Sequence, residues 1–97
     1  MTGYRVLPEA RDDLASAVAH YDSEFPGLGQ DLAREAQRLC SLIAKSPLTG
    51  QEVRPGIRRR LLRRFPYAIL YSRESSGILV IAVTHQRRRP GYWWRRV

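Results

Sequence analysis

The first half of the chain carries two stretches whose apolar residues recur every three or four positions, which is typical of amphipathic helices. The first covers about residues 8–25, and Pro8 suits its opening turn because that turn does not use the N–H group that proline lacks. The second begins near Gly29 and ends at Ser46 and Pro47. Because only a few residues separate the two helices, we expect them to pack as an antiparallel hairpin.

Outside the helices the apolar positions tend to alternate with polar ones, as they do in strands. A short strand is expected over residues 4–7, and the turn-forming prolines and glycines of residues 47–56 predict a loop. Three further strands are expected over residues 57–64, 67–73 and 78–85. The segment Ser75-Ser76-Gly77 predicts a tight hairpin turn between the last two strands.

These elements predict an α+β fold with the order β-α-α-β-β-β. The two-helix hairpin would form one layer and a mostly antiparallel four-stranded sheet the other, with room for a short helical turn at the C-terminus. Tyr67, Ile69 and Tyr71 share one face of their strand and are expected in the core. The second face of the sheet is expected to be partly open.

Charge is distributed unevenly along the chain. Residues 1–46 carry five basic and seven acidic groups, whereas residues 47–97 carry twelve arginines and only Glu52 and Glu74 as acids. Arginine bonds carboxylates and phosphates through two parallel N–H groups and stacks on flat rings. We therefore expect the C-terminal half to form a recognition surface for an anionic partner; the alternative is an arginine excess that reflects a GC-rich genome.

The single cysteine, Cys40, cannot form an internal disulfide, which favours a reducing compartment. The N-terminal residues lack the apolar segment of a signal peptide, and no stretch approaches the roughly 18 apolar residues that a membrane span requires. We therefore expect a cytoplasmic protein that folds as one domain over residues 1–97.

Several short motifs follow one another in a fixed order along the chain. They are Tyr4-Arg5-Val6, Phe65-Pro66-Tyr67, an apolar strand ending in His85, Arg89-Pro90 and Tyr92-Trp93. In this order they resemble the RelE/ParE superfamily of type II toxins, and more closely its ParE-like plasmid-stabilisation toxins. The resemblance implies a toxin that is paired with a small antitoxin. RelE-like members cut mRNA in the ribosomal A site, whereas ParE-like members poison DNA gyrase.

Cleavage of RNA would require a base, an acid and cationic stabilisation of the transition state. If the protein is a ribonuclease, its candidate catalytic residues are His85, Arg58, Arg60, Arg89 and Tyr92. His85 titrates in the right range, and strict strand alternation would place it on the same face as Leu79, Ile81 and Val83. A hydrogen-bonded histidine that closes the core is the plainer interpretation of that position.

Two features of the chain weaken the nuclease hypothesis. Lys45 is the only lysine, so the chain lacks the lysine-rich site of some RelE-type nucleases. Acids are also scarce in the basic half, where a Glu–His pair, as other members use, would require Glu52 to approach His85; the sequence leaves that approach open. We therefore favour a ParE-like inhibitor of DNA gyrase that performs no chemistry. The alternatives are a RelE-like ribosome-dependent mRNA endonuclease and a basic nucleic-acid-binding domain without toxicity. No cofactor or metal is expected.

A surface for the target or the antitoxin is predicted from the basic and aromatic residues of the C-terminal half. The predicted residues are Arg58, Arg60, Arg64, Arg87, Arg88, Arg89, Trp94, Arg95 and Arg96. The charged strand over residues 57–64 equally fits a sheet edge, where charges discourage aggregation. In the C-terminal segment, basic groups interleaved with aromatic rings suit stacking on bases, and we expect Trp93 to be buried and Trp94 exposed.

The resemblance also implies the nature of the partner. An acidic antitoxin that is disordered alone and folds on binding would provide a reversible off state. It would lay an amphipathic helix against the helical hairpin and extend towards the basic sheet, forming a toxin–antitoxin hetero-oligomer.

Overall fold

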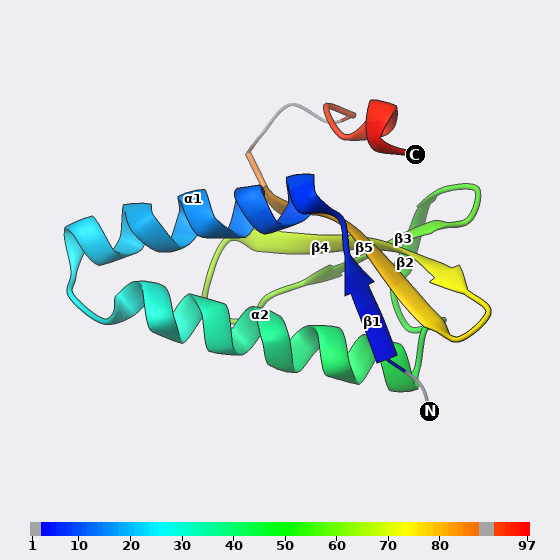
Figure 1. Ribbon diagram of the computed structural model, residues 1–97, viewed down its shortest axis with the longest axis horizontal. Coiled ribbons are helices and arrows are strands. Elements are labelled where there is room, and N and C mark those ends of the chain that lie inside the picture. The colour runs from blue at the N-terminus through cyan, green and yellow to red at the C-terminus, as the bar shows by residue number, and fades with distance from the viewer. Residues whose placement is uncertain (1–2, 88–90) are drawn as a thin grey trace.

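The computed structural model describes residues 3–87 and 91–97, which form two α-helices, a five-stranded sheet and one 3-10 helix (Figure 1). The elements are β1 (Gly3–Val6), α1 (Pro8–Glu24), α2 (Leu28–Lys45), β2 (Gln51–Arg54), β3 (Ile57–Leu61), β4 (Tyr67–Glu74), β5 (Gly77–His85) and the 3-10 helix η1 (Trp94–Arg96). Both predicted helices, the predicted α+β class and the predicted C-terminal helical turn are confirmed. No helix in the described ranges has the length and apolar character of a membrane span.

The sheet has the strand order β1-β5-β4-β3-β2, in which β1 runs parallel to β5 and every other pair is antiparallel. The prediction of four strands was wrong, because part of the expected loop over residues 47–56 forms β2. This strand is short and fully exposed, so it has no apolar alternation that would predict it. It forms because its backbone pairs with that of β3, where Gln51 lies opposite Arg59. The edge on this side is therefore β2, and the arginine-rich β3 lies inside the sheet.

The two helices form the expected antiparallel hairpin, which covers one side of the sheet (Figure 1). They approach closely where α2 begins. A Cβ at Gly29 would overlap the carbonyl oxygen of Val18 and lie 2.7 Å from the side chain of Asp22, so only glycine fits there. The backbone N–H of Gly29 donates to the Asp22 carboxylate at 2.7 Å and thereby caps the first turn of α2.

The larger core lies between the helices and the sheet, on what we call the helix side. Tyr67, Ile69 and Tyr71 belong to it, as predicted. Tyr71 is fully buried, and its hydroxyl donates to the carbonyl of Pro47 at 2.8 Å and accepts from the N–H of Gly50 at 3.0 Å. A tyrosine from the sheet thus fixes the connection between α2 and β2.

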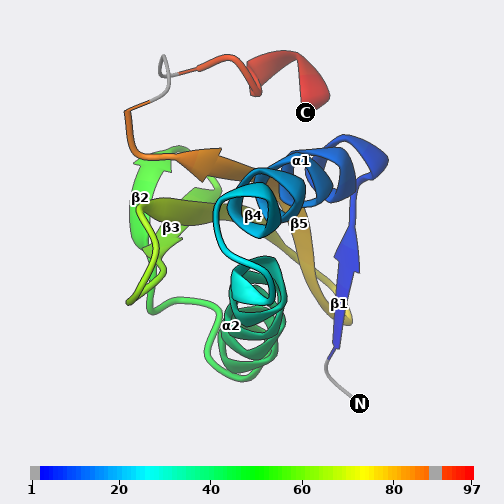
Figure 2. The same ribbon diagram turned by 90° about the vertical axis from the view of Figure 1, so that its left-hand side faces the viewer.

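The opposite face of the sheet, which we call the outer side, carries a second, smaller core. Ile57, Leu70 and Ile81 pack there beneath Trp93, which is buried at 6% exposure. The prediction that Trp93 would be buried is confirmed, but the prediction of a partly open second face was wrong at this place. Figure 2 shows the C-terminal segment lying across the sheet from α2. The aromatic end of the chain therefore serves as a cover for the sheet.

An irregularity in β5 decides which side chains face the helices. Val80 lies opposite Tyr71 and Ala82 lies opposite Leu70, so Ile81 is an extra residue that forms a β-bulge. Before the bulge Val80 faces the helix-side core, and after it Val83 does. The alternation of inward and outward side chains thus shifts by one residue within the strand.

Cys40 offers a simple test of this packing. Burial in the helix-side core raises the pKa of its thiol to about 12, which leaves very little thiolate at pH 8. We expect the native protein to resist labelling by a thiol reagent, and the unfolded protein in denaturant to react as a free cysteine does. Rapid and complete labelling of the folded protein would contradict the placement of α2.

Candidate functional site

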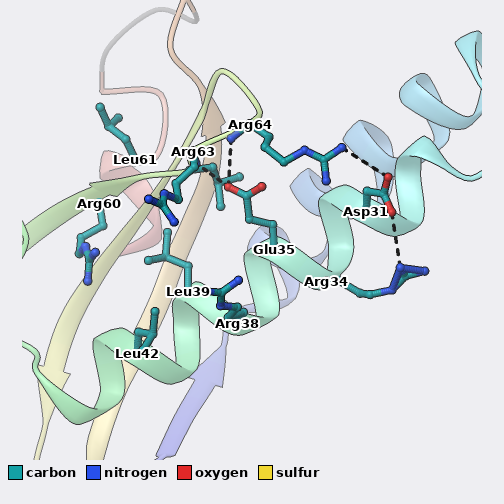
Figure 3. Close-up of a pocket in the computed structure, with 11 residues that line it drawn as sticks. Asp31, Arg34, Glu35, Arg38, Leu39, Leu42, Arg60, Leu61, Arg63 and Arg64 are labelled. Atoms are coloured by element: carbon teal, nitrogen blue, oxygen red, sulfur yellow. Dashed lines mark hydrogen bonds and ion pairs between the residues drawn. The ribbon is translucent and has the colours of Figure 1, made fainter.

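A groove of about 820 Å³ separates the exposed side of α2 from the end of β3 and the segment that follows it (Figure 3). It is lined by Asp31, Arg34, Glu35, Arg38, Leu39, Leu42, Arg60, Leu61, Leu62, Arg63 and Arg64. Five of these residues are arginines and two are acids, which gives the lining a net charge of +3. Both elements contribute arginines, so the groove concentrates positive charge that is far apart in the sequence.

The acidic residues of the groove hold its two walls together. The carboxylate of Glu35 on α2 accepts from the backbone N–H groups of Arg63, at 2.5 Å, and Arg64, at 3.2 Å. Asp31 lies one turn earlier on α2 and pairs with the guanidinium groups of Arg34, at 3.4 Å, and Arg64, at 3.5 Å. Both carboxylates thus anchor the segment after β3 to α2, so they are bonded within the chain.

Other arginines of the groove have no acidic partner. Arg38, Arg60 and Arg63 form no ion pair with any carboxylate of the described residues. Within the part of the chain that the structure describes, Arg60 donates to the hydroxyl of Thr49 alone, at 3.3 Å. Figure 3 shows Arg38 on α2 and Arg60 on β3, which form the two walls of the groove. These guanidinium groups remain available for carboxylates or phosphates of a partner.

The floor of the groove is apolar. Leu39 and Leu62 are buried there, and Leu42, one helical turn beyond Leu39, is 45% exposed. Exposed leucine beside unpaired arginine is the combination expected of a protein-binding groove, in which apolar anchors provide affinity and charged groups provide orientation. The groove is therefore suited to an amphipathic, acidic segment.

A second cleft, of about 440 Å³, lies between α1 and the ends of β4 and β5. It is lined by Glu9, Asp12, Asp13, Ser16, Ala17, His20, Tyr67, Val83, His85 and Arg96. Its two histidines come from different elements, and within residues 3–87 and 91–97 no three His, Cys, Asp or Glu side chains are arranged so that they could hold a metal ion. Burial raises the pKa of Tyr67, so this phenol is neutral at physiological pH.

The base of this cleft is an ion pair between the first helix and the C-terminal segment. Arg96 donates to both carboxylate oxygens of Asp13, at 2.6 and 3.1 Å, and the two side chains are only 15% and 8% exposed. Arg96 also donates to the carbonyl of Ile81, while Asp13 accepts from the N–H of Val83, each at 3.1 Å. The Asp13–Arg96 pair therefore connects α1, β5 and the C-terminus, and this bonding raises the pKa of Arg96.

His85 faces α1 rather than the outer side. The prediction that it shares a face with Leu79, Ile81 and Val83 holds only for Val83, because the bulge at Ile81 leaves Leu79 and Ile81 on the outer side and places Val83 and His85 on the helix side. Its ring meets Tyr67 edge-on at 5.1 Å, and its Nδ1 accepts from the N–H of Arg87 at 3.0 Å. This hydrogen bond occupies the lone pair of Nδ1.

The residues proposed for RNA cleavage do not converge in the structure. Arg60 lines the first groove and His85 the second cleft, and the buried row that contains Ile69 lies between them. Arg58 donates to the carbonyls of Leu48, at 3.3 Å, and Gly50, at 2.7 Å, which is a structural role.

Two further parts of the nuclease hypothesis have other partners. Glu52 accepts from the N–H of Gly56 at 3.0 Å instead of approaching His85. Tyr92 stacks under the guanidinium of Arg96 at 5.0 Å, and its hydroxyl lies 3.4 Å from Asp13.

The predicted binding residues are distributed over several places. Arg60 and Arg64 lie in the groove, Arg96 is bound to Asp13, and Arg88 and Arg89 fall outside the described residues. Arg87 and Arg95 are exposed, and Trp94 is 51% exposed. Sequence reasoning missed the contribution of α2, which is Asp31, Arg34, Glu35, Arg38 and Leu42. Their spacing of three and four residues along one face of the helix was a usable signal.

The chain was compared with known proteins. It matches the family model described as the ParE toxin of the type II toxin–antitoxin system parDE over residues 4–90. A solved structure described as the chromosomal ParDE TA system from P. aeruginosa superimposes with a TM-score of 0.77 at 17% sequence identity, and covers 88% of this chain and 96% of the other. No curated protein matches the sequence.

Loss of charge at Asp13 should destabilise the fold strongly. The Asp13→Asn substitution deprives the nearly buried Arg96 of its counter-charge. Breaking a buried ion pair in this way costs about 3 kcal/mol or more. We expect urea unfolding to show that loss in the free energy of unfolding. The matched control is Asp12→Asn, an exposed neighbour, which should change it by less than about 0.5 kcal/mol. Equal effects of the two substitutions would contradict the assigned role of Asp13.

Proposed function

Because the chain belongs to the ParE toxin family of type II toxin–antitoxin systems, we propose that it inhibits DNA gyrase without cutting RNA and that a cognate antitoxin keeps it inactive. We infer gyrase as the target because the resemblance to ParE-like toxins implies that they poison gyrase. We infer an antitoxin because the family belongs to a type II toxin–antitoxin system, and we assign its binding site to the groove beside α2. The proposed target and antitoxin place this activity in the bacterial cytoplasm.

The absence of chemistry in this proposal is supported by the arrangement of the polar residues. A nuclease needs its base and its cationic groups within reach of one phosphate. In the described residues His85 faces α1, whereas Arg58 is bound to loop carbonyls and Arg60 faces α2. This separation favours a toxin that acts by binding.

The observation that carries the antitoxin proposal is the pairing of exposed leucine with unpaired arginine in the groove. An acidic amphipathic helix could place its apolar residues on Leu39 and Leu42 and its carboxylates on Arg38 and Arg60. Each desolvated arginine–carboxylate pair would contribute on the order of 1–3 kcal/mol. The similar solved structure belongs to a ParDE system, which agrees with a partner of this kind.

A pair of assays tests the target. The purified protein should inhibit supercoiling by DNA gyrase and leave mRNA intact in a coupled translation reaction. His85→Ala should retain at least half of the inhibition, because the proposed mechanism uses no general base; circular dichroism would establish that this variant is folded. Message that is cut codon by codon, with supercoiling unaffected, would overturn the proposal in favour of a ribosome-dependent endonuclease.

A charge-reversal series tests the groove. Arg38→Glu and Arg60→Glu should each weaken binding of the antitoxin encoded beside the toxin gene by at least about tenfold, because each replaces an attractive contact by a repulsive one. The control is Arg11→Glu, which changes net charge equally at an exposed position of α1 that does not line the groove. Isothermal titration calorimetry gives the affinities. An equal loss for the control would mean that net charge alone drives binding.

A further inference from the structure

The outer side of the sheet carries an exposed aromatic ring beside a cation, at the edge formed by β2. The guanidinium carbon of Arg54 lies 4.4 Å from the centre of the Trp94 ring. Trp94 is 51% exposed, whereas its neighbour Trp93 is buried. Gly91 permits this arrangement, because a Cβ there would lie 2.6 Å from the Trp94 ring. The fold therefore places an indole where solvent and a ligand can reach it.

A second arginine lies on the same side of the sheet. Ile57 belongs to the outer core, so strand alternation places Arg59 on the outer side as well. Its guanidinium donates to the side-chain carbonyl of Gln51, the residue opposite it on β2, at 2.9 Å. Within the described residues neither Arg54 nor Arg59 forms an ion pair with a carboxylate. Their charges are therefore not neutralised inside the chain.

We infer that Arg54, Arg59 and Trp94, here called the outer patch, bind single-stranded nucleic acid. This function goes beyond the inhibition of gyrase and the capture by an antitoxin proposed above. The two guanidinium groups would contact phosphates, and the indole would contact an unpaired base. Arg95 follows Trp94 directly in η1 and is exposed, so it adds to the positive charge of the C-terminal segment.

The chemistry of the outer patch distinguishes a nucleic acid from an acidic peptide. The groove beside α2 has exposed leucine for the apolar side chains of a peptide, whereas the outer patch presents an aromatic ring stacked with arginine. Stacking of a base on an aromatic side chain does not depend on sequence and contributes roughly 1–3 kcal/mol per base. The outer patch is therefore better suited to a nucleic acid, which combines flat bases with an anionic backbone, than to an acidic peptide.

The two surfaces lie on opposite sides of β3. Arg60 faces α2 and lines the groove, while Arg59, the residue before it in the strand, points the other way and does not line the groove. Figure 3 shows Arg60 and Leu61 directed away from each other. A partner held in the groove would thus leave the outer patch accessible, and the two binding functions can be tested separately.

Fluorescence anisotropy of a labelled oligothymidylate of about twelve nucleotides tests this inference. At about 50 mM salt the intact protein should bind it, with an affinity that falls steeply as salt is raised. The double substitution Arg54→Gln/Arg59→Gln should weaken binding at least tenfold more than Arg38→Gln/Arg63→Gln in the groove. The two variants lose the same net charge, so a non-specific effect of charge would be equal in both.

Trp94→Ala tests the contribution of the aromatic ring. It should weaken binding at least about fivefold, because it removes the stacking of one base. Because this change could disturb the C-terminal segment, Arg59→Gln alone, which leaves that segment untouched, should also weaken binding. Failure of the intact protein to bind, equal losses for the two double variants, or equally tight binding of an oligoglutamate of similar length would overturn the inference. Failure of the intact protein to inhibit gyrase, with normal oligonucleotide binding, would count against the proposed function and leave this inference standing.

Discussion

The Asp13–Arg96 ion pair provides hydrogen-bond partners for backbone groups of β5 that no neighbouring strand reaches. β5 is nine residues long but its parallel neighbour β1 has only four, so the second half of β5 has an edge with no strand beside it. Arg96 donates to the carbonyl of Ile81 and Asp13 accepts from the N–H of Val83, as the backbone of another strand would. Unpaired backbone groups in such a buried position would cost about 1–3 kcal/mol each. The ion pair therefore allows β5 to continue past β1 and secures the C-terminal segment.

The groove beside α2 and the outer patch both depend on the sheet that this contact completes. The C-terminal segment, held by Arg96, places Trp93 over the outer core and Trp94 beside Arg54. On the helix side the groove depends on the register of β3, because only that register turns Arg60 towards α2 and Arg59 away from it. One arginine-rich strand thus supplies both sides of the molecule, with alternate residues serving different surfaces.

Much of the architecture could be predicted from the periodicity of the sequence. Both helices, the turn at Ser75 and Ser76, and the buried face of β4 were found, because each depends on apolar spacing or local turn chemistry. The strand β2 was missed because it is exposed, has no apolar alternation and depends on its neighbour for hydrogen bonds. The orientation of His85 was wrong because a bulge shifts the alternation, and nothing in the sequence near Ile81 marks it.

The candidate site was predicted less completely than the fold. The C-terminal arginines drew attention because they are numerous, yet Arg96 is buried in a structural pair and Arg58 is bonded to a loop. The contact between Asp13 and Arg96 joins residues at opposite ends of the chain, and no local pattern reveals it. The groove needs both α2 and the segment after β3, and only the tertiary structure brings Leu42 and Arg60 to the same place.

Hydrogen–deuterium exchange of the toxin with and without its antitoxin tests most directly whether the groove beside α2 receives the partner. If it does, exchange slows in α2 and in residues 61–64 when the antitoxin is bound, and exchange in β2 and η1 is unchanged. Protection confined to β2 and η1, with α2 exchanging as in the free toxin, would contradict it.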